Sequence, residues 1–299
     1  MIEELLTLKD GRKLGYGIYG NPQGFPVLDF HGIPGSRREA ALIAEFLGRG
    51  DLCFIGFDRP GYGRSTPRRG FRILDLPEDV AALADHLKLD RFIALGYSGG
   101  GPFALAFAAR FPQRIAALGI VSGVGPAGIG SAGMHESNKR KFDMARQMPW
   151  LARAMLLVAF SNLRRNPERF ASQLHRIWGQ MPAPDQKALG DTRFADGILA
   201  VSRDAILNSV RGWVNEELLM AAPWGFELQE IDCPDIYLWH GGMDKNVPIA
   251  MAKAVARQLP NCHASFLEEE GHLSLLYNHG NKIIDTLVQA GKMKISQNG

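Results

Sequence analysis

The sequence predicts an α/β fold in which a mainly parallel sheet is interrupted by a helical insert. Short apolar runs alternate with helical patterns in the first part of the chain, which is typical of strand–helix alternation. In residues 125–222 the strand runs stop, and helical patterns rich in Met, Trp, Arg and Ala replace them. The alternation then resumes. We therefore expect a core of residues 1–124 and 223–299 around an insert of residues 125–222.

The expected strands are short and apolar throughout. Asp10 and Gly11 separate residues 3–7 from residues 14–19, and this Asp-Gly pair predicts a hairpin. Continuous apolar runs are typical of strands that are covered on both faces. Such strands are expected at residues 27–30, 52–57, 92–96 and 115–121, and two further strands are expected at residues 236–239 and 264–267.

Helical patterns lie between these strands. Asp75 is followed by Pro77 in the first turn and by Glu78 three residues on, which predicts a helix start with a capping box. Further helices are expected at residues 103–110 and 249–259, and through residues 283–288. Prolines in the insert divide it into short helices, because proline breaks a helix interior.

Charge and composition exclude several classes of protein. The formal net charge is +3, and the basic clusters around Arg68 and Lys139 are small, so nucleic-acid binding is not expected. The most apolar stretch, residues 151–160, is too short to span a bilayer, and membrane insertion is not expected. The acidic start of the chain does not resemble a signal peptide.

The three cysteines are Cys53, Cys233 and Cys262. Their odd number and scattered positions predict reduced thiols in a cytoplasmic protein rather than a disulfide framework. Histidines and cysteines do not occur at zinc-ligand spacing, so we expect neither a metal nor another cofactor.

A candidate nucleophile lies between a predicted strand and a predicted helix. Residues Gly96-Tyr97-Ser98-Gly99-Gly100 match the pattern G-x-S-x-G. A strand that turns sharply into a helix strains the serine backbone and needs small neighbours, which the outer glycines provide. A serine hydroxyl is a weak nucleophile near neutral pH, and it needs a base that an acid orients. We therefore predict Ser98 as the nucleophile of a catalytic triad.

Candidates for the acid and the base follow Ser98 in the order expected for this architecture: serine, acid, histidine. Asp244 comes shortly after the strand at residues 236–239, and His272 comes shortly after the strand at residues 264–267. The carboxyl ends of parallel strands are where such sheets collect their active sites. We expect His272 to act as the base and Asp244 to orient it.

Other titratable side chains fit these roles less well. The rival acids lie in the insert, three rival bases precede the acid in the chain, and a fourth lies far along the final helix. These residues are Asp196 and Asp204, then His31, His86 and His240, and finally His279.

Acyl transfer also needs hydrogen-bond donors for the developing oxyanion. One donor is expected to be the backbone N–H of Gly99, the residue after the nucleophile. The other is expected from the loop His31-Gly32-Ile33-Pro34-Gly35, which follows the strand at residues 27–30. Proline has no N–H, so we select Ile33, with Gly32 as the second choice.

Together these motifs resemble the cap-bearing α/β-hydrolase superfamily, in its branch of carboxylesterases and aminopeptidases. The motifs are residues 31–35, 58–65 and 96–100, Gly241-Gly242-Met243-Asp244, and Gly271-His272. The resemblance implies an α/β-hydrolase fold: an eight-stranded, mostly parallel sheet with a helical cap inserted after the sixth strand.

Some branches of the superfamily fit less closely. Prolyl aminopeptidases usually carry a second glycine and a tryptophan where this chain has Ile33 and Gly99. Dehalogenases and epoxide hydrolases of the superfamily use an aspartate nucleophile, and Ser98 argues against both.

The leading functional hypothesis is a cofactor-free serine hydrolase that acts through an acyl-enzyme on a small, largely apolar ester, thioester, lactone or amide. A carbon–carbon bond hydrolase with the same triad is an alternative. A binding protein that uses the fold as a pocket is another alternative, although a binder has no need of Asp244. The expected partner is a small-molecule substrate, and the sequence does not predict the oligomeric state.

The insert is expected to be a mobile lid that decides substrate size. Its methionines and aromatic residues could line an apolar pocket, although most are expected to form the core of the insert itself. These residues are Met134, Met144, Met148, Trp150, Met155, Phe160, Trp178 and Trp213.

Overall fold

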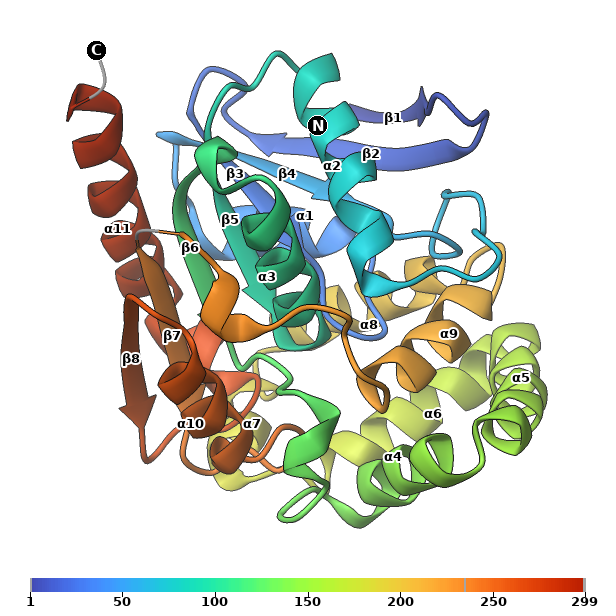
Figure 1. The fold of residues 1–299 in the computed structure, drawn as a ribbon. Coiled ribbons are helices and arrows are strands. Elements are labelled where there is room, and N and C mark those ends of the chain that lie inside the picture. The colour runs from blue at the N-terminus through green and yellow to red at the C-terminus, as the bar shows by residue number, and fades with distance from the viewer. Residues whose placement is uncertain (1, 234, 298–299) are drawn as a thin grey trace.

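The computed structural model describes residues 2–233 and 235–297, and its centre is one eight-stranded sheet (Figure 1). The strand order is β1-β2-β4-β3-β5-β6-β7-β8. Strand β2 runs antiparallel to both of its neighbours, and the other neighbouring strands are parallel. The strands are β1 (Ile2–Thr7), β2 (Lys13–Gly20), β3 (Phe25–Phe30), β4 (Leu52–Phe57), β5 (Phe92–Tyr97), β6 (Ile115–Val121), β7 (Ile236–Gly241) and β8 (Cys262–Leu267). The predicted α/β fold with an eight-stranded, mostly parallel sheet is confirmed.

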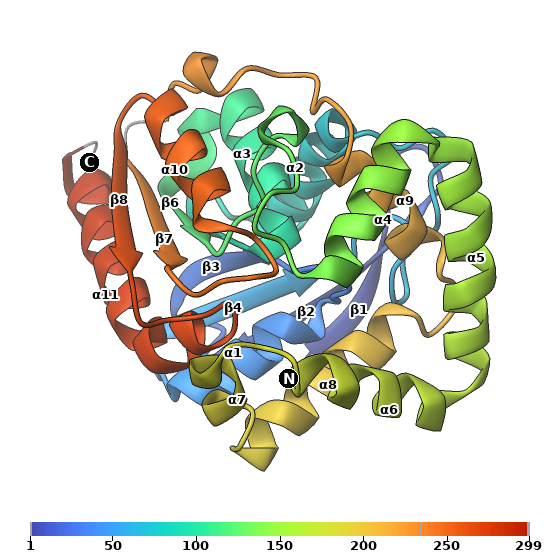
Figure 2. The same ribbon diagram turned by 90° about the horizontal axis from the view of Figure 1, so that it is seen from below.

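Helices cover both faces of this sheet (Figure 2). Helices α1 (Arg38–Leu47) and α11 (Ser274–Gln297) pack on one face, with Ile43 and Leu287 in the apolar layer. Helices α2 (Leu76–His86), α3 (Gly101–Arg110) and α10 (Ile249–Gln258) pack on the other face. Strands β3 to β6 are therefore buried on both sides, which explains their continuous apolar sequence.

The start of α2 differs from its prediction. The helix begins at Leu76, but the capping box predicted for Asp75 and Glu78 is wrong. The chain already turns in the 3₁₀ helix Ile73–Asp75, and the Asp75 carboxylate there accepts a hydrogen bond from the backbone N–H of Arg72 at 2.8 Å. The side chain is therefore directed away from the N–H groups of α2.

Among the described residues, six α-helices lie between β6 and β7. They gather beyond one end of the sheet, along the lower part of Figure 1, with α4, α5 and α6 at the right and α7 farther left. They are α4 (Glu136–Gln147), α5 (Pro149–Arg165), α6 (Pro167–Trp178), α7 (Ala183–Ala188), α8 (Thr192–Ala205) and α9 (Arg211–Met220). Prolines stand at the first position of α5 and of α6, where the missing N–H costs no helical hydrogen bond. We call residues 125–222 the helical insert. Its boundaries with the core, at residues 125 and 222, stay a prediction.

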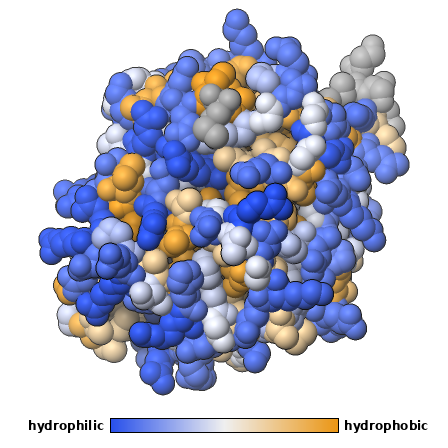
Figure 3. Space-filling model, turned by 180° about the vertical axis from the view of Figure 1, so that it is seen from behind, coloured by the Kyte–Doolittle hydropathy of each residue, from blue (hydrophilic) through white to orange (hydrophobic). Residues whose placement is uncertain are grey.

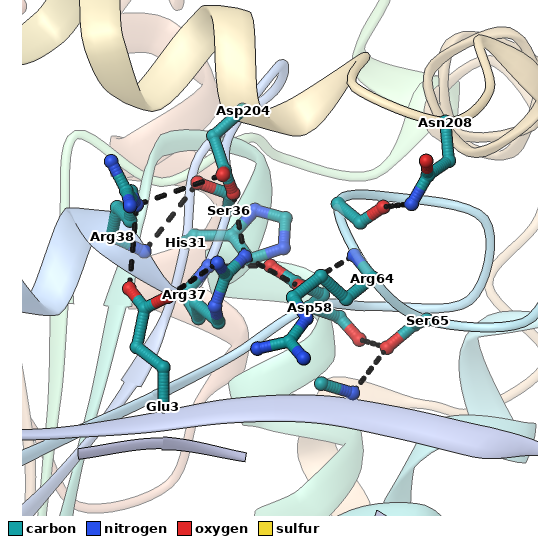
Figure 4. Close-up of polar contacts among 12 residues, drawn as sticks. Glu3, His31, Ser36, Arg37, Arg38, Asp58, Arg64, Ser65, Asp204 and Asn208 are labelled. Atoms are coloured by element: carbon teal, nitrogen blue, oxygen red, sulfur yellow. Dashed lines mark hydrogen bonds and ion pairs between the residues drawn. The ribbon is translucent and has the colours of Figure 1, made fainter. Parts of the chain in front are cut away.

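A buried arginine connects the helical insert to the core (Figure 4). The Arg37 guanidinium donates to Glu3 on β1 at 2.7 Å, to Asp58 after β4 at 3.0 Å, and to Asp204 on α8 at 2.6 Å. Breaking a buried ion pair leaves an uncompensated charge, so this cluster fixes the position of α8 against the core. Because the Asp204 carboxylate accepts this hydrogen bond from Arg37, Asp204 is no longer a candidate for the catalytic acid.

The surface opposite the view of Figure 1 is mostly hydrophilic, with small apolar patches between the polar side chains (Figure 3). Among the helices within residues 2–233 and 235–297, none is long and apolar enough to cross a membrane.

Candidate active site

Ser98 stands at a sharp turn between β5 and α3. Its backbone φ is +51°, in the left-handed region that non-glycine residues rarely adopt. A Cβ atom on Gly100 would overlap the carbonyl oxygen of Phe30 at the end of β3, so the turn passes too close to the neighbouring strand for any other residue. The tight turn therefore presents the Ser98 hydroxyl at the carboxyl end of the sheet.

Ser98, His272 and Asp244 form a continuous hydrogen-bonded chain. The Nε2 atom of His272 lies 3.0 Å from Oγ of Ser98, and its Nδ1 atom lies 2.7 Å from Oδ2 of Asp244. The three residues come from the ends of β5, β7 and β8, which lie at one edge of the sheet. The predicted residues are thus brought together in the geometry that activates a serine hydroxyl.

The Asp244 carboxylate is held in one orientation. Its Oδ1 atom accepts hydrogen bonds from the backbone N–H groups of Asn246 at 2.8 Å and Val247 at 2.9 Å. Oδ2 is thereby directed at His272. His240 also lies near this oxygen, at 3.5 Å, but its Nε2 atom is 2.8 Å from the Val247 carbonyl oxygen.

The remaining rival side chains have other contacts. His31 lies 2.8 Å from the carbonyl oxygen of Gly32, and His86 contacts Tyr16. His279 lies 2.8 Å from Glu270, and Asp196 is exposed on α8.

The surroundings of His272 favour its protonated form. Burial alone would lower the pKa of the imidazole, but the Asp244 carboxylate and, to a smaller extent, Asp185 and Glu39 together outweigh it, so the pKa is raised above its usual value. A raised pKa makes the imidazole a stronger base toward the Ser98 hydroxyl, provided that the pH is high enough to keep it neutral.

Glu39 on α1 decides which N–H group of the loop after β3 is free to bind an oxyanion. Both of its carboxylate oxygens accept a hydrogen bond from the backbone N–H of Gly32, each at 3.0 Å. Gly32, our second choice as an oxyanion donor, is therefore already engaged. A Cβ atom on Gly99 would overlap the Ile33 side chain, so the two residues predicted to supply the N–H groups are adjacent.

A buried ion pair supports the same loop from behind. Arg59 donates to the carbonyl oxygens of His31 and Gly32, and to the Glu216 carboxylate on α9 at 2.6 and 2.7 Å. Tyr62 donates to Glu216 at 2.9 Å. The loop is thus held by a cation whose counter-charge comes from the helical insert, and the arrangement satisfies these buried groups.

A cavity of about 300 Å³ lies between the core and the helical insert. Ser98, His272, Ile33 and Gly99 are at its core side. Its wall in the insert is largely apolar and includes Phe142, Leu163, Phe170, Trp178, Met181 and Trp213. The volume and the apolar lining are typical of sites for small organic molecules.

The insert side chains singled out from the sequence have different surroundings. Met134, Trp178 and Trp213 line the cavity. Met144 and Phe160 pack in the apolar clusters of the insert, and so do Met134 and Trp213. Met148, Trp150 and Met155 are exposed, so half of the set of eight, rather than most of it, contributes to the core of the insert. Trp150 and Met155 lie on α5, and Met148 directly precedes that helix.

Within residues 2–233 and 235–297, no group of three or more His, Cys, Asp or Glu side chains is arranged to hold a metal ion.

The family model described as the alpha/beta hydrolase fold matches residues 26–278, which contain the whole site. The chain belongs to the α/β-hydrolase fold family. The resemblance inferred from the motifs is therefore confirmed.

Known α/β-hydrolase proteins resemble the chain to different extents. A Bacillus subtilis (strain 168) protein, provisionally named 2-succinyl-6-hydroxy-2,4-cyclohexadiene-1-carboxylate synthase, is 26% identical over 274 residues, 89% of this chain and 90% of that protein. The proline iminopeptidase of Xylella fastidiosa (strain 9a5c) is 33% identical over 117 residues, 38% of this chain and 37% of that protein. The matches to proline iminopeptidases span only about a third of those proteins.

Among solved structures, a thermophilic esterase from Thermogutta terrifontis has a TM-score of 0.67 and 22% identity, with 97% of this chain and 99% of that chain covered. At this level of identity the likeness shows the shared α/β-hydrolase fold.

Three buried carboxylates around the site were not predicted from the sequence: Glu39, Asp185 and Glu216. Glu39 carries a weak local signal, because it follows Gly32 by seven residues at the start of α1. Asp185 and Glu216 are acidic residues in helical patterns of the insert, and nothing in their neighbourhood in the sequence distinguishes them from surface residues.

Proposed function

We propose that the protein is a serine hydrolase that cleaves a small, largely apolar acyl compound through an acyl-enzyme. The observation that carries the proposal is the hydrogen-bonded chain from Ser98 through His272 to Asp244, which opens into an apolar cavity. The substrate class is an ester, thioester, lactone or amide, with a carboxylic ester as the preferred case.

In the first half of the reaction, His272 Nε2 accepts the hydroxyl proton while Ser98 Oγ attacks the carbonyl carbon of the substrate. The carbonyl electron pair moves to oxygen, where the N–H groups of Ile33 and Gly99 would stabilise the negative charge. When this pair returns, the bond to the leaving group breaks, and the leaving group takes the proton from His272. An acyl ester on Ser98 remains.

In the second half, His272 removes a proton from a water molecule, which attacks the acyl ester. Collapse of the second tetrahedral intermediate releases the carboxylic acid and returns the proton to Ser98 Oγ. Asp244 stays ionised throughout and stabilises the imidazolium formed in each half. The helical insert acts as a cap that excludes bulk water from these steps.

The charges in the cavity favour an uncharged substrate. Among the described residues that line it, the carboxylates are Glu39 and Glu217. Glu217 accepts from Lys141 Nζ at 2.8 Å and from Trp213 Nε1 at 3.0 Å. Burial raises the pKa of Glu39 to about 7, and this side chain is bonded to Gly32. Neither carboxylate is available as the counter-charge of a substrate ammonium, so a neutral ester fits better than a peptide with a free amino terminus.

The two alternatives use the same pocket. A carbon–carbon bond hydrolase would employ the same triad on a different substrate, whereas a binding protein would not require the Asp244–His272 pair. The scattered cysteines favour a cytoplasmic location, and the proposed partner is the small-molecule substrate.

A fluorophosphonate tests the proposal directly, because it phosphonylates an activated serine. We expect one probe molecule per chain, located on Ser98 by peptide mass spectrometry, with loss of hydrolysis of chromogenic esters in proportion to labelling. A chain that remains unlabelled under these conditions would contradict the serine mechanism and favour the binding protein.

Ser122 offers a matched control for this labelling. It also follows a strand, has a φ of +50°, and donates its hydroxyl hydrogen bond to the carbonyl oxygen of His272 at 3.2 Å. Tyr97 donates to the same carbonyl at 3.1 Å, so that oxygen keeps a partner in Ser122→Ala. Ser122→Ala should still be labelled at Ser98, whereas Ser98→Ala should not be labelled at all.

Substrate size is expected to depend on Trp178, which lines the cavity and is 8% exposed. Trp178→Ala enlarges the cavity and should shift preference toward longer acyl chains, mainly through KM. Each additional methylene group that it buries is worth about 0.8 kcal/mol, or about fourfold in KM. The measurement is kcat/KM for a series of ester chain lengths.

Trp150 serves as the control for this series, because it is 73% exposed on α5 and is not among the residues that line the cavity. Trp150→Ala should leave the chain-length profile unchanged. If Trp178→Ala also leaves it unchanged, specificity is set elsewhere, and the loops around Ile33 and Tyr62 become the candidates.

A further inference from the structure

A carboxylate of the helical insert accepts hydrogen bonds from the backbone around His272. Asp185 on α7 is fully buried. Its Oδ2 atom accepts a hydrogen bond from the N–H of His272 at 3.0 Å, and its Oδ1 atom accepts from the N–H groups of Leu273 and Ser274, both at 2.9 Å. Asp185 therefore satisfies the free N–H groups at the start of α11 from a segment 87 residues earlier in the chain.

The loop before α11 is shaped around this carboxylate. A Cβ atom on Gly271 would overlap both carboxylate oxygens of Asp185, so only glycine leaves room for them. The N–H of Gly271 donates instead to the Ser274 hydroxyl at 2.8 Å. Four successive N–H groups, from Gly271 to Ser274, thus have partners, and three of these groups share Asp185.

We propose that Asp185 is a positioning residue, which holds the backbone of His272 so that its imidazole reaches Ser98 and Asp244 together. The inference rests on the serine mechanism proposed above. It assigns the insert a part in catalysis beyond covering the cavity: the insert helps to assemble the base. A residue that sets the imidazole position acts on the chemical step, because misplacement by about 1 Å can cost about 10²-fold in rate.

The charge of Asp185 provides a second way to detect its role. Among the described residues, the charged and titratable groups that face His272 are Asp244 after β7, His240 on β7, Tyr97 on β5, Glu39 on α1 and Asp185 on α7. Burial lowers the pKa of His272, Asp244 raises it most, and Asp185 raises it further. Removal of the Asp185 charge should therefore lower the pKa of the base, and the acid limb of kcat/KM should move to lower pH.

Asp185→Asn is the first variant to measure. We expect kcat and the rate of fluorophosphonate labelling to fall by about 10²-fold, with KM nearly unchanged and the acid limb shifted to lower pH. A residue with a purely structural role would reduce the amount of folded protein without moving the pH profile of the folded fraction.

Asp191 provides the matched control. It is an aspartate of the same insert; its side chain caps α8 by accepting from the N–H of Arg193 at 3.0 Å, and it accepts from Tyr277 of α11 at 3.3 Å. It does not contact the backbone of His272 in the described structure. Asp191→Asn should therefore retain the wild-type kcat and pH profile.

Gly271→Ala tests the same contact from the other side, and the kcat of its folded fraction alone decides the question if the variants of Asp185 do not fold. The added Cβ atom displaces the carboxylate, so kcat should fall as in Asp185→Asn. In the background of Asp185→Ala, which removes the carboxylate, Gly271→Ala should cost little more, and this non-additivity identifies the shared contact.

The outcomes separate the two proposals. Wild-type protein that fluorophosphonate does not label overturns the serine mechanism, and the role of Asp185 with it. Labelled wild-type protein together with an unchanged kcat and pH profile in Asp185→Asn, or additive effects of Gly271→Ala and Asp185→Ala, overturns the positioning role alone.

Discussion

Ser98→Ala is expected to lower kcat for ester hydrolysis by about 10⁴- to 10⁶-fold, the largest effect of any single substitution in the molecule. The variant lacks the protein oxygen that attacks the carbonyl carbon of the substrate in the proposed mechanism. The cavity and the oxyanion loop remain, so KM should change little, and a small residual rate over water should persist. The measurement is steady-state kinetics on the chromogenic ester that the wild-type protein hydrolyses best.

The fold should tolerate Ser98→Ala, because alanine is smaller and the strained turn depends on the neighbouring glycines. A φ of +51° at position 98 is unfavourable for serine and for alanine alike. Thermal unfolding should therefore give a midpoint close to that of the wild-type protein. Near-normal turnover by a folded Ser98→Ala variant is the result that rules out Ser98 as the nucleophile.

Asp244→Asn is expected to lower kcat by about 10⁴-fold, by analogy with the same change in serine proteases. The backbone N–H groups of Asn246 and Val247 both donate to Oδ1 of Asp244. In the variant this position must be the amide oxygen, so the NH₂ group takes the Oδ2 position and faces His272. It then donates to Nδ1, which places the proton of the neutral imidazole on Nε2. That tautomer cannot accept the proton of Ser98.

The matched control for this variant is Asp196→Asn, which changes an exposed aspartate on α8 that the sequence also offered as an acid. We expect it to have wild-type kcat. The opposite pattern, with Asp244→Asn silent and Asp196→Asn impaired, would assign the orienting acid to the insert. The pH profile provides an additional check, because loss of the Asp244 charge should lower the pKa of His272.

The turn at Ser98 could be predicted because its causes are local. A strand, a small residue, the serine and a second small residue occur within a few positions, and the close approach of Gly100 to Phe30 requires that pattern. Asp244 and His272 could be predicted for a related reason: each follows a strand, and parallel strands place their carboxyl ends at one edge.

Local patterns failed where two local partners compete. Asp75 has the spacing of a helix cap, yet its carboxylate bonds to the N–H of Arg72, because the preceding 3₁₀ turn brings that group nearer. The methionines of the insert show the same limit. Met134 lines the cavity and Met148 is exposed, although the sequence offered both as candidates for the pocket.

The sequence by itself determined the α/β fold, the order of the sheet elements around the insert, and the three residues proposed for catalysis, since these depend on periodicity and on chain order. Only the tertiary structure decided which groups support them. The Asp185 carboxylate accepts a hydrogen bond from the backbone N–H of His272, and the Glu216 carboxylate accepts one from the Arg59 guanidinium. The Glu39 carboxylate accepts one from the backbone N–H of Gly32. A buried carboxylate needs donors, but those donors belong to segments that meet only after folding, and so no spacing in the sequence identifies them.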